Sequence, residues 1–140
     1  TATSYFDGQY LNGEIRNGSE NTALAGKRLE TVPEWTSRNG LQCSFKKLSA
    51  ILQYSYTADS YSDALNTETP SANGAKGLVP SYQIWDLNLS YRFAPGYLLK
   101  FGVNNLTDEQ YFTKRPAGYP GQGVWSSDGR SVVVSLGIRI

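Results

Sequence analysis

The stretch Gly129–Ile140, with the sequence GRSVVVSLGIRI, ends the chain on a regular alternation of residue types. Its apolar members occupy every second position: Val132, Val134, Leu136, Ile138 and Ile140. The positions between them are mixed: Ser131, Val133, Ser135, Gly137 and Arg139. Because successive side chains of a strand point to opposite faces, this pattern predicts a strand with an apolar medium on one side only. That medium is either a protein core or a lipid bilayer.

The composition favours strands and excludes several classes of protein. The chain has 140 residues with 13 basic and 12 acidic side chains, so it lacks the large positive net charge that would indicate nucleic-acid binding. Aromatic residues reach 13% and apolar residues only 39%, a mixture typical of β-structure. No stretch approaches the roughly 18 apolar residues of a transmembrane helix, so only a barrel of strands could carry this chain across a membrane. Cys43 stands alone, which excludes an intrachain disulfide, and the absence of Met predicts an excised or processed piece.

Turn residues divide the chain into six predicted strands with connections of two lengths. The strands are expected at residues 2–10, 35–45, 48–61, 84–93, 97–104 and 131–140. Short turns at 46–47 and 94–96 alternate with long links at 11–34, 62–83 and 105–130, so all three long links fall on one side. Links of this length are uncommon in compact domains. Short turns on one side and long loops on the other are typical of outer-membrane β-barrels.

The parity of the side chains provides a second test. The more apolar parity of the last five strands contains no charged residue. The other parity carries Arg38, Asp59, Asp86, Arg92, Lys100 and Arg139. The first strand gives no clear choice of face. Aromatic residues also collect near the strand ends: Phe45, Tyr91, Phe93 and Tyr97 beside the short turns, and Trp35 and Trp85 toward the long loops. Such bands are expected at membrane interfaces.

A soluble sandwich and a catalytic function are the two interpretations that compete with a membrane barrel. In a secreted sandwich protein, such as an enzyme or a lectin, apolar and polar residues would also alternate along the strands. The polar row of this chain, however, is too polar to pack on a second sheet without extensive hydrogen bonding or ion pairing. Catalysis is poorly supported, because the chain has no His, one Cys and carboxylates that fall mostly in predicted loops. The run Gly118–Gly123 is interrupted by Pro120 and has no predicted helix after it, so it does not resemble a phosphate-binding loop. We therefore predict no enzymatic activity, no metal site and no cofactor.

One constellation resembles a known family. Asn104-Asn105-Leu106-Thr107-Asp108, followed by Tyr111 and later by Gly129-Arg130, is similar to the C-terminal end of TonB-dependent outer-membrane transporters. Further elements resemble the branch related to ferric dicitrate receptors. They are Gly26–Pro33, Tyr61–Thr67, Asn73-Gly74, Val79–Tyr82, Arg115, Gly118–Gly121 and Ser127–Arg130.

The resemblance implies an architecture and a set of partners. The chain would be the last six strands of a 22-stranded antiparallel transmembrane barrel, with residues 1–140 forming the C-terminal portion of the barrel domain. The plug and the region that contacts TonB would be absent from this chain, so it could not transport alone. The intact protein would lie in the outer membrane of a Gram-negative bacterium and take up a ferric chelate such as iron dicitrate or a siderophore. Ile140 departs from the family, whose members usually end on an aromatic residue.

Within this resemblance, loop residues are the candidates for contact with an anionic chelate. Such a ligand requires guanidinium or hydroxyl donors, so we expect Arg115, Tyr119 and Gln122 to bind it, with Lys114 and Arg28 behind them. Asn105 and Asp108 are expected to shape the backbone, because Asx side chains bond to nearby backbone groups and tolerate positive φ. The charges of the polar row are expected mainly in inter-strand ion pairs. The alternative function is a small self-contained barrel or adhesin that binds a surface partner through its long loops.

Overall fold

The computed structural model describes residues 1–118 and 121–139, and the regular structure within them is strand. The strands are β1 (Ala2–Tyr5), β2 (Glu14–Asn17), β3 (Glu20–Ala23), β4 (Trp35–Phe45), β5 (Leu48–Thr57), β6 (Ser60–Tyr61), β7 (Leu78–Val79), β8 (Tyr82–Ala94), β9 (Tyr97–Asn104), β10 (Phe112–Lys114), β11 (Trp125–Ser126) and β12 (Ser131–Ile138). None of the described residues belongs to a helix long and apolar enough to cross a membrane. Tyr119 and Ile140 lie outside the described residues.

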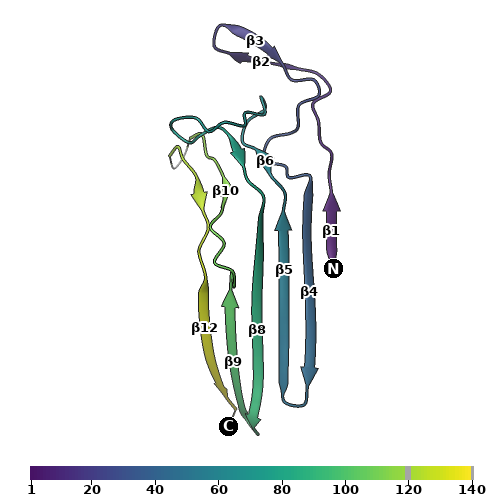
Figure 1. Ribbon diagram of the computed structural model, residues 1–140, viewed down its shortest axis with the longest axis vertical. Helices are drawn as coiled ribbons and strands as arrows, with labels where there is room; N and C mark the ends of the chain where they lie inside the picture. The colour runs from purple at the N-terminus through teal and green to yellow at the C-terminus, as the bar shows by residue number, and fades with distance from the viewer. Residues whose placement is uncertain (119–120, 140) are drawn as a thin grey trace.

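Six of the strands form one antiparallel sheet in the order β1-β4-β5-β8-β9-β12 (Figure 1). The turns β4–β5 and β8–β9 lie at one end, which we call the turn end, and the long connections gather at the other, the loop end. The six predicted strands and the alternation of their connections are therefore confirmed. Three small two-stranded sheets inside the loops, β2–β3, β6–β7 and β10–β11, were not predicted.

Four of the six predicted strands have different bounds in the structure. The first strand ends at Tyr5 rather than Tyr10, because the chain then turns to follow the first loop, where Gln9 forms an isolated bridge with Arg28. The fourth strand is β8, residues 82–94 rather than 84–93, because Tyr82 still pairs with Thr57 across the ladder. This difference moves one aromatic ring from a predicted loop into the sheet.

The third and the last predicted strands are shorter than expected. The third ends at Thr57 rather than Tyr61, because Ser60–Tyr61 forms β6 and pairs with β7 in a separate small sheet. The last strand, predicted to reach Ile140, ends at Ile138, where its pairing with Tyr97 completes the ladder with β9.

The register assembles the predicted apolar parity into one continuous face, the apolar face. One row across five strands consists of Leu41, Leu52, Leu87, Val103 and Val132, and the next consists of Cys43, Ala50, Leu89, Phe101 and Val134. The opposite side, the polar face, carries in one row Ser44, Ser49, Ser90, Lys100 and Ser135. The register also assigns β1, whose Thr3 and Tyr5 pair with Ser37 and Trp35 on the apolar face.

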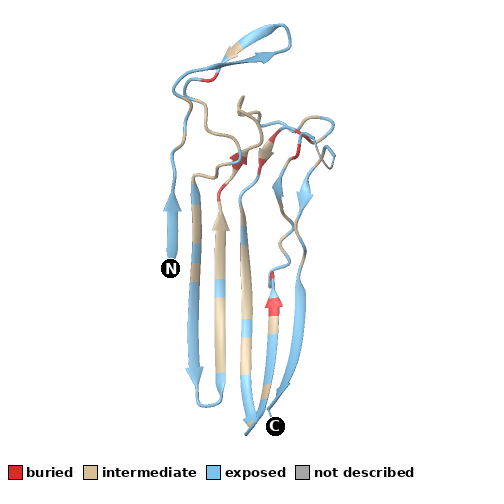
Figure 2. Cartoon of the chain, turned by 180° about the vertical axis from the view of Figure 1, so that it is seen from behind, coloured by how far each residue is buried: buried red, intermediate tan, exposed pale blue. Residues whose placement is uncertain are grey.

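The sheet is a single layer, and no large side chain among the described residues is fully buried. Leu41 is 68% exposed and Val134 is 65% exposed, at opposite ends of the two apolar rows. Figure 2 shows the few buried segments near the loops and the loop-side ends of strands rather than along the sheet. A second packed layer is absent from the described part of the chain, so the sandwich interpretation is wrong. A continuous apolar face of this extent requires another apolar phase to cover it.

Aromatic pairs mark both ends of the apolar face. Tyr5 and Trp35 have ring centroids 4.6 Å apart and Tyr54 and Trp85 4.5 Å apart, near the loop end. At the turn end Phe93 lies 5.5 Å from Tyr97, beside a register shift between Tyr91 and Ala94. Trp85 and Phe93 are eight positions apart in the sequence. That separation is about 26 Å along a strand, or about 20 Å of depth for a strand tilted by about 40°, close to the apolar band of a membrane barrel.

The turn between β8 and β9 is tied to the end of β12. Gly96 has a φ of 77°, in the left-handed region that favours glycine. The backbone N–H of Arg139 donates to its carbonyl oxygen over 2.8 Å. A Cβ at position 96 would lie 2.6 Å from the backbone oxygen of Arg139. The close approach of the two segments therefore requires glycine here.

We predict that a charge is tolerated on one face and not on the other. In the intact protein refolded into phospholipid vesicles, Leu87→Arg should lower the free energy of unfolding by about 2 to 4 kcal/mol, because it places a guanidinium in hydrocarbon. Asn88→Arg, at the adjacent position on the polar face, should change it much less. Denaturant titration of both variants measures the difference. Equal losses would contradict the assignment of the faces.

Candidate functional site

The three long connections meet at the loop end of the sheet. We call them the first loop (residues 6–34), the second loop (residues 58–81) and the third loop (residues 105–130). The second loop contacts both of the other loops. Many of these contacts are made by two arginines, Arg28 of the first loop and Arg115 of the third loop. The loop end is therefore the part of the structure where polar side chains from distant segments converge.

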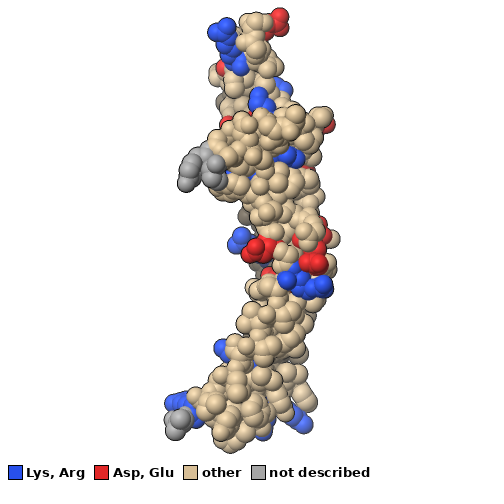
Figure 3. Space-filling view, turned by 90° about the vertical axis from the view of Figure 1, so that its left-hand side faces the viewer, with Lys and Arg blue, Asp and Glu red and all other residues tan. Residues whose placement is uncertain are grey.

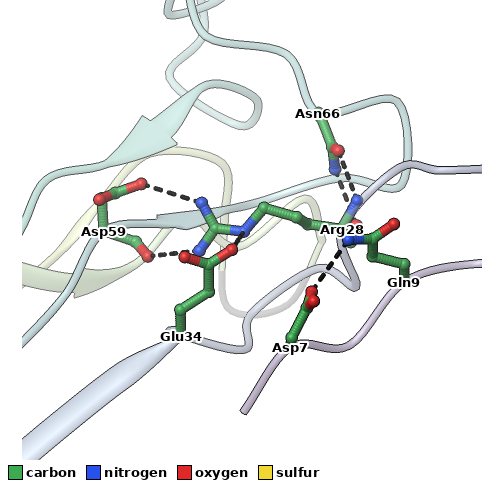
Figure 4. Close-up of polar contacts among 6 residues, drawn as sticks. All are labelled: Asp7, Gln9, Arg28, Glu34, Asp59 and Asn66. Carbon is green, nitrogen blue, oxygen red and sulfur yellow. Dashed lines mark hydrogen bonds and ion pairs between the residues drawn. The ribbon is translucent and has the colours of Figure 1, made fainter. Parts of the chain in front are cut away.

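Arg28 of the first loop binds the second loop through its guanidinium (Figure 4). Its Nη1 lies 3.3 Å from Oδ2 of Asp59, and its Nη2 donates to the Asp59 carbonyl over 3.3 Å. Within the first loop, its Nε lies 3.0 Å from Oε1 of Glu34. The same guanidinium lies over the ring of Tyr61 at 5.3 Å. Only 20% of the Arg28 side chain is exposed, so these contacts are partly shielded from water.

Backbone contacts of the same segment strengthen this junction. The N–H of Arg28 donates to Oδ1 of Asn66 over 2.7 Å, and Nδ2 of Asn66 donates back to the Arg28 carbonyl over 2.8 Å. Asn66 has a φ of 55°, which asparagine tolerates better than most residues. Beside it, the ammonium of Lys27 donates to the carbonyl of Leu65 over 2.8 Å.

A second contact stabilises the first loop internally. The hydroxyl of Tyr10 donates to Oε2 of Glu30, and this hydrogen bond to a carboxylate raises the pKa of Tyr10 above its ordinary value. The tyrosine therefore remains protonated, and able to donate, throughout the neutral range. It holds the start and the end of the first loop together.

Arg115 of the third loop makes the corresponding contact from the other side. Its Nε donates to the Leu78 carbonyl over 3.0 Å and its Nη1 to the Gly74 carbonyl over 3.1 Å, while the guanidinium lies 4.7 Å from the ring of Phe112. The second loop itself requires Gly77, which has a φ of 126° and where a Cβ would lie 2.8 Å from Cα of Pro70. The second loop is thus held by one arginine from each neighbour.

The predicted ligand-binding residues have the following places. Arg115 is half-buried in the contact with the second loop, and Gln122 is exposed and accepts a hydrogen bond from Nδ2 of Asn73 over 3.1 Å. Tyr119 lies outside the described residues. Lys114 lies over the ring of Trp125 at 5.5 Å, and Arg28 is engaged as described above. The structure brings Arg115 and Gln122 to the same second loop, and their contact with a ligand stays a prediction.

The structural role predicted for Asn105 and Asp108 is confirmed. Both have positive φ, 51° and 57°. Oδ1 of the buried Asn105 accepts from the Glu109 N–H over 2.9 Å, and Oδ1 of Asp108 accepts from the Arg130 N–H over 2.8 Å. The N–H of Asn105 in turn donates to Oδ1 of Asp86 over 2.8 Å, a contact that the sequence did not predict.

The charges of the polar face are arranged differently from the prediction. Within residues 1–118 and 121–139, none of Arg38, Asp86, Arg92, Lys100 and Arg139 lies within 4.0 Å of an opposite charge, so inter-strand ion pairing was wrong for them. On the side seen in Figure 3, the charged side chains visible at the turn end are basic, whereas basic and acidic side chains lie together in the middle and at the loop end. The described residues contain no cluster of His, Cys, Asp and Glu suited to a metal ion.

Comparison with known proteins identifies the sheet. The family described as TonB dependent receptor-like, beta-barrel matches residues 1–106. The chain belongs to this family. Its antiparallel sheet corresponds to part of the wall of such a receptor barrel, left open at β1 and β12 because these strands form the two edges. The predicted fold class is therefore confirmed.

Individual relatives in this family are much longer than the chain. The siderophore receptor PiuA of Acinetobacter baumannii is 26% identical over 144 residues, covering 93% of the chain and 17% of PiuA. The vitamin B12 transporter BtuB of Vibrio vulnificus is 27% identical over 87 residues, covering 62% of the chain and 13% of BtuB. The crystal structure of the ferric citrate transporter FecA in the unliganded form has the same fold, with a TM-score of 0.73 and 23% identity over 82% of this chain and 18% of FecA. The chain spans less than a fifth of each.

We predict that Arg28 joins the first and second loops of the receptor into one unit. In the intact receptor, Arg28→Ala should increase amide hydrogen exchange in residues 58–67 by about tenfold, because partly exposed ion pairs and hydrogen bonds of this kind together contribute about 1 to 2 kcal/mol. Arg16→Ala is the matched control, since the Arg16 side chain donates to the Gly18 carbonyl within its own hairpin. Exchange in residues 58–67 that is unchanged in Arg28→Ala would contradict the junction.

Proposed function

We propose that this chain is the C-terminal wall of a TonB-dependent receptor in the outer membrane of a Gram-negative bacterium, and that the intact receptor takes up a ferric chelate. The observation that carries the proposal is the apolar face, which runs across the strands without a charged residue and ends in aromatic pairs at both margins. Lipid acyl chains would cover this face, and the aromatic rings would lie at the two interfaces.

The alternation of loops and turns sets the orientation of the wall. Barrels of this class have short periplasmic turns and long extracellular loops. The three joined loops would therefore face the outside and form part of the vestibule, and Lys46-Lys47 and Pro95-Gly96 would face the periplasm. The polar face would line the lumen.

The remaining parts of the receptor would come from outside this chain. We propose a barrel of 22 strands, of which residues 1–140 are the C-terminal portion, with a plug domain and a TonB-contacting region elsewhere in the protein. The wall alone would not transport the ferric chelate. Its partners would be the ferric chelate, TonB through that other region, and outer-membrane lipid. Nucleic acid is not among them, and no chemical reaction or cofactor is required of this wall.

The proposed substrate class rests on the relatives and on the loop chemistry. The relatives named above are a siderophore receptor, a ferric citrate transporter and a vitamin B12 transporter. Iron dicitrate or a siderophore is the substrate that we propose within this range. Arg115, Tyr119 and Gln122 would supply guanidinium, phenol and amide groups to such an anion from the third loop. An adhesin that binds a surface partner through the same loops is the alternative, and membership of a receptor family favours uptake.

We predict TonB-dependent iron uptake by the intact receptor. The full-length gene, expressed in a Gram-negative host that lacks its own ferric-chelate receptors, should restore accumulation of radioactive iron supplied as ferric citrate or as a ferric siderophore. The same strain without TonB should accumulate none above background, because TonB supplies the energy for release into the periplasm. Accumulation that is independent of TonB, or absent with every chelate offered, would contradict the proposal.

We predict that Gln122 contributes to binding of the chelate. Gln122→Ala in the intact receptor should weaken equilibrium binding by about fivefold, the effect of losing one hydrogen bond of about 1 kcal/mol. Gln110→Ala is the matched control, since Gln110 is also exposed in the third loop and its side chain donates to the Asp108 carbonyl close by in the sequence. Equal affinities of the Gln122→Ala receptor and the unaltered receptor would remove Gln122 from the site.

A further inference from the structure

The turn end of the sheet carries charge of one sign. The segments that reach it, residues 39–58, 87–107 and 131–140, contain no acidic residue, although the chain has 12 of them. Their basic residues are Lys46, Lys47, Arg92, Lys100 and Arg139. The charged side chains visible at the turn end in Figure 3 are accordingly basic. A positive potential therefore surrounds this end of the wall.

Two of these basic residues form the turn between β4 and β5. Lys46 and Lys47 are both exposed. The Nζ of Lys46 lies 5.2 Å from the centroid of the Phe45 ring, in a cation–π contact. Phe45 is the last residue of β4, belongs to the apolar face and is 67% exposed. The ammonium of Lys46 therefore lies beside the margin of the apolar face.

The turn directly follows a complete apolar row that crosses five strands. The register assigns to this row Phe45, Leu48, Tyr91, Leu99 and Leu136. In the orientation proposed above, acyl chains cover this row and the headgroup layer of the periplasmic leaflet begins beyond it. A lysine in this place can lay its hydrocarbon stem along the row and hold its ammonium among the headgroups.

The backbone of the turn holds the two lysines in place. The N–H of Arg92 donates to the Lys47 carbonyl over 2.9 Å, which ties the turn to β8. Lys46 has a φ of 53°, a conformation that glycine or asparagine adopts at lower cost than lysine. Backbone preference thus does not explain a lysine at position 46, whereas contact with a negatively charged surface does.

We propose that the Lys46-Lys47 turn binds the headgroups of anionic phospholipids in the periplasmic leaflet of the outer membrane. This inference rests on the proposed function, which places the apolar face in lipid. Each ammonium would approach a phosphate oxygen. A zwitterionic headgroup also carries an ammonium, and the turn end offers it no acidic side chain, so the surface selects lipids with a net negative charge. The contact of Lys46 with Phe45 favours lipid over an acidic protein segment, because it holds the charge beside the acyl chains.

Quenching of a tryptophan by brominated lipids tests this surface in the intact receptor. Tyr91→Trp provides the reporter, because Tyr91 pairs with Leu48, the residue after Lys47, and is 45% exposed on the apolar face. Receptors with and without the reporter are reconstituted into phosphatidylcholine vesicles that contain brominated phosphatidylglycerol or brominated phosphatidylcholine at equal fractions. The additional quenching in the reporter receptor should favour phosphatidylglycerol by about fivefold or more at low salt, and this preference should largely disappear in about 1 M sodium chloride.

Substitution of the turn should remove this preference. With Lys46→Gln and Lys47→Gln together, the two brominated lipids should quench the reporter nearly equally. Lys46→Arg with Lys47→Arg keeps both charges and should keep the preference. Lys76→Gln with Lys100→Gln is the matched control, since it removes two charges from the second loop and the polar face and should change nothing. Unfolding temperatures in detergent, matched to the unaltered receptor, exclude loss of folding as the cause.

The outcomes separate this inference from the proposed function. Quenching of the reporter by neither lipid would show that the apolar face does not contact acyl chains, and would overturn both. Equal quenching by the two lipids in the unaltered turn would leave the proposed function standing and overturn the lipid surface, as would a preference that survives Lys46→Gln with Lys47→Gln. A preference that falls equally in the control pair would assign the effect to the overall charge of the receptor, and would also overturn the inference.

Discussion

Backbone hydrogen bonding across the strands is the interaction on which the rest of the structure depends. The sheet has one layer and no fully buried large side chain among the described residues, so packing contributes little to holding it together. The ladders from β1 to β12 supply that cohesion, and their register determines which side chains share a face. A shift of one residue would exchange the apolar row of Leu41 and Leu52 with the polar row of Gln42 and Ile51. In lipid, moreover, unpaired backbone groups have no water to bond.

The parts of the fold that follow from local periodicity could be predicted from the sequence. Alternation at Val132, Val134 and Leu136 identifies a strand and its apolar face without any knowledge of the partner strand. The positive φ values of Asn105 and Asp108 follow from the chemistry of those two side chains and their neighbours. Strand ends were less predictable, because Tyr82 belongs to β8 only through its pairing with Thr57, which is distant in the sequence.

The candidate site depended on contacts that have no local signal. Arg28 meets Asp59 across 31 positions and Asn66 across 38, and Arg115 meets Leu78 across 37. An arginine side chain in a Gly-rich loop can bind either a ligand or a backbone carbonyl of a neighbouring loop. The residue type alone therefore did not predict which of these two partners it has. The stacking of Tyr82 on Tyr111 was missed for a related reason, since both rings were expected in loops and the contact joins β8 to the third loop.

Gly96 has a consequence for the alignment of β12 on the sheet. The β8–β9 hairpin closes through a local turn, whereas β12 reaches β9 only after the whole third loop. The carbonyl of Gly96 therefore gives β12 a reference point outside the ladder itself, because the N–H of Arg139 bonds to it when Ile138 is paired with Tyr97. A side chain at position 96 would strain the turn, where φ is positive, and would also obstruct the approach of Arg139. One residue thus serves both the hairpin and the register of the edge strand.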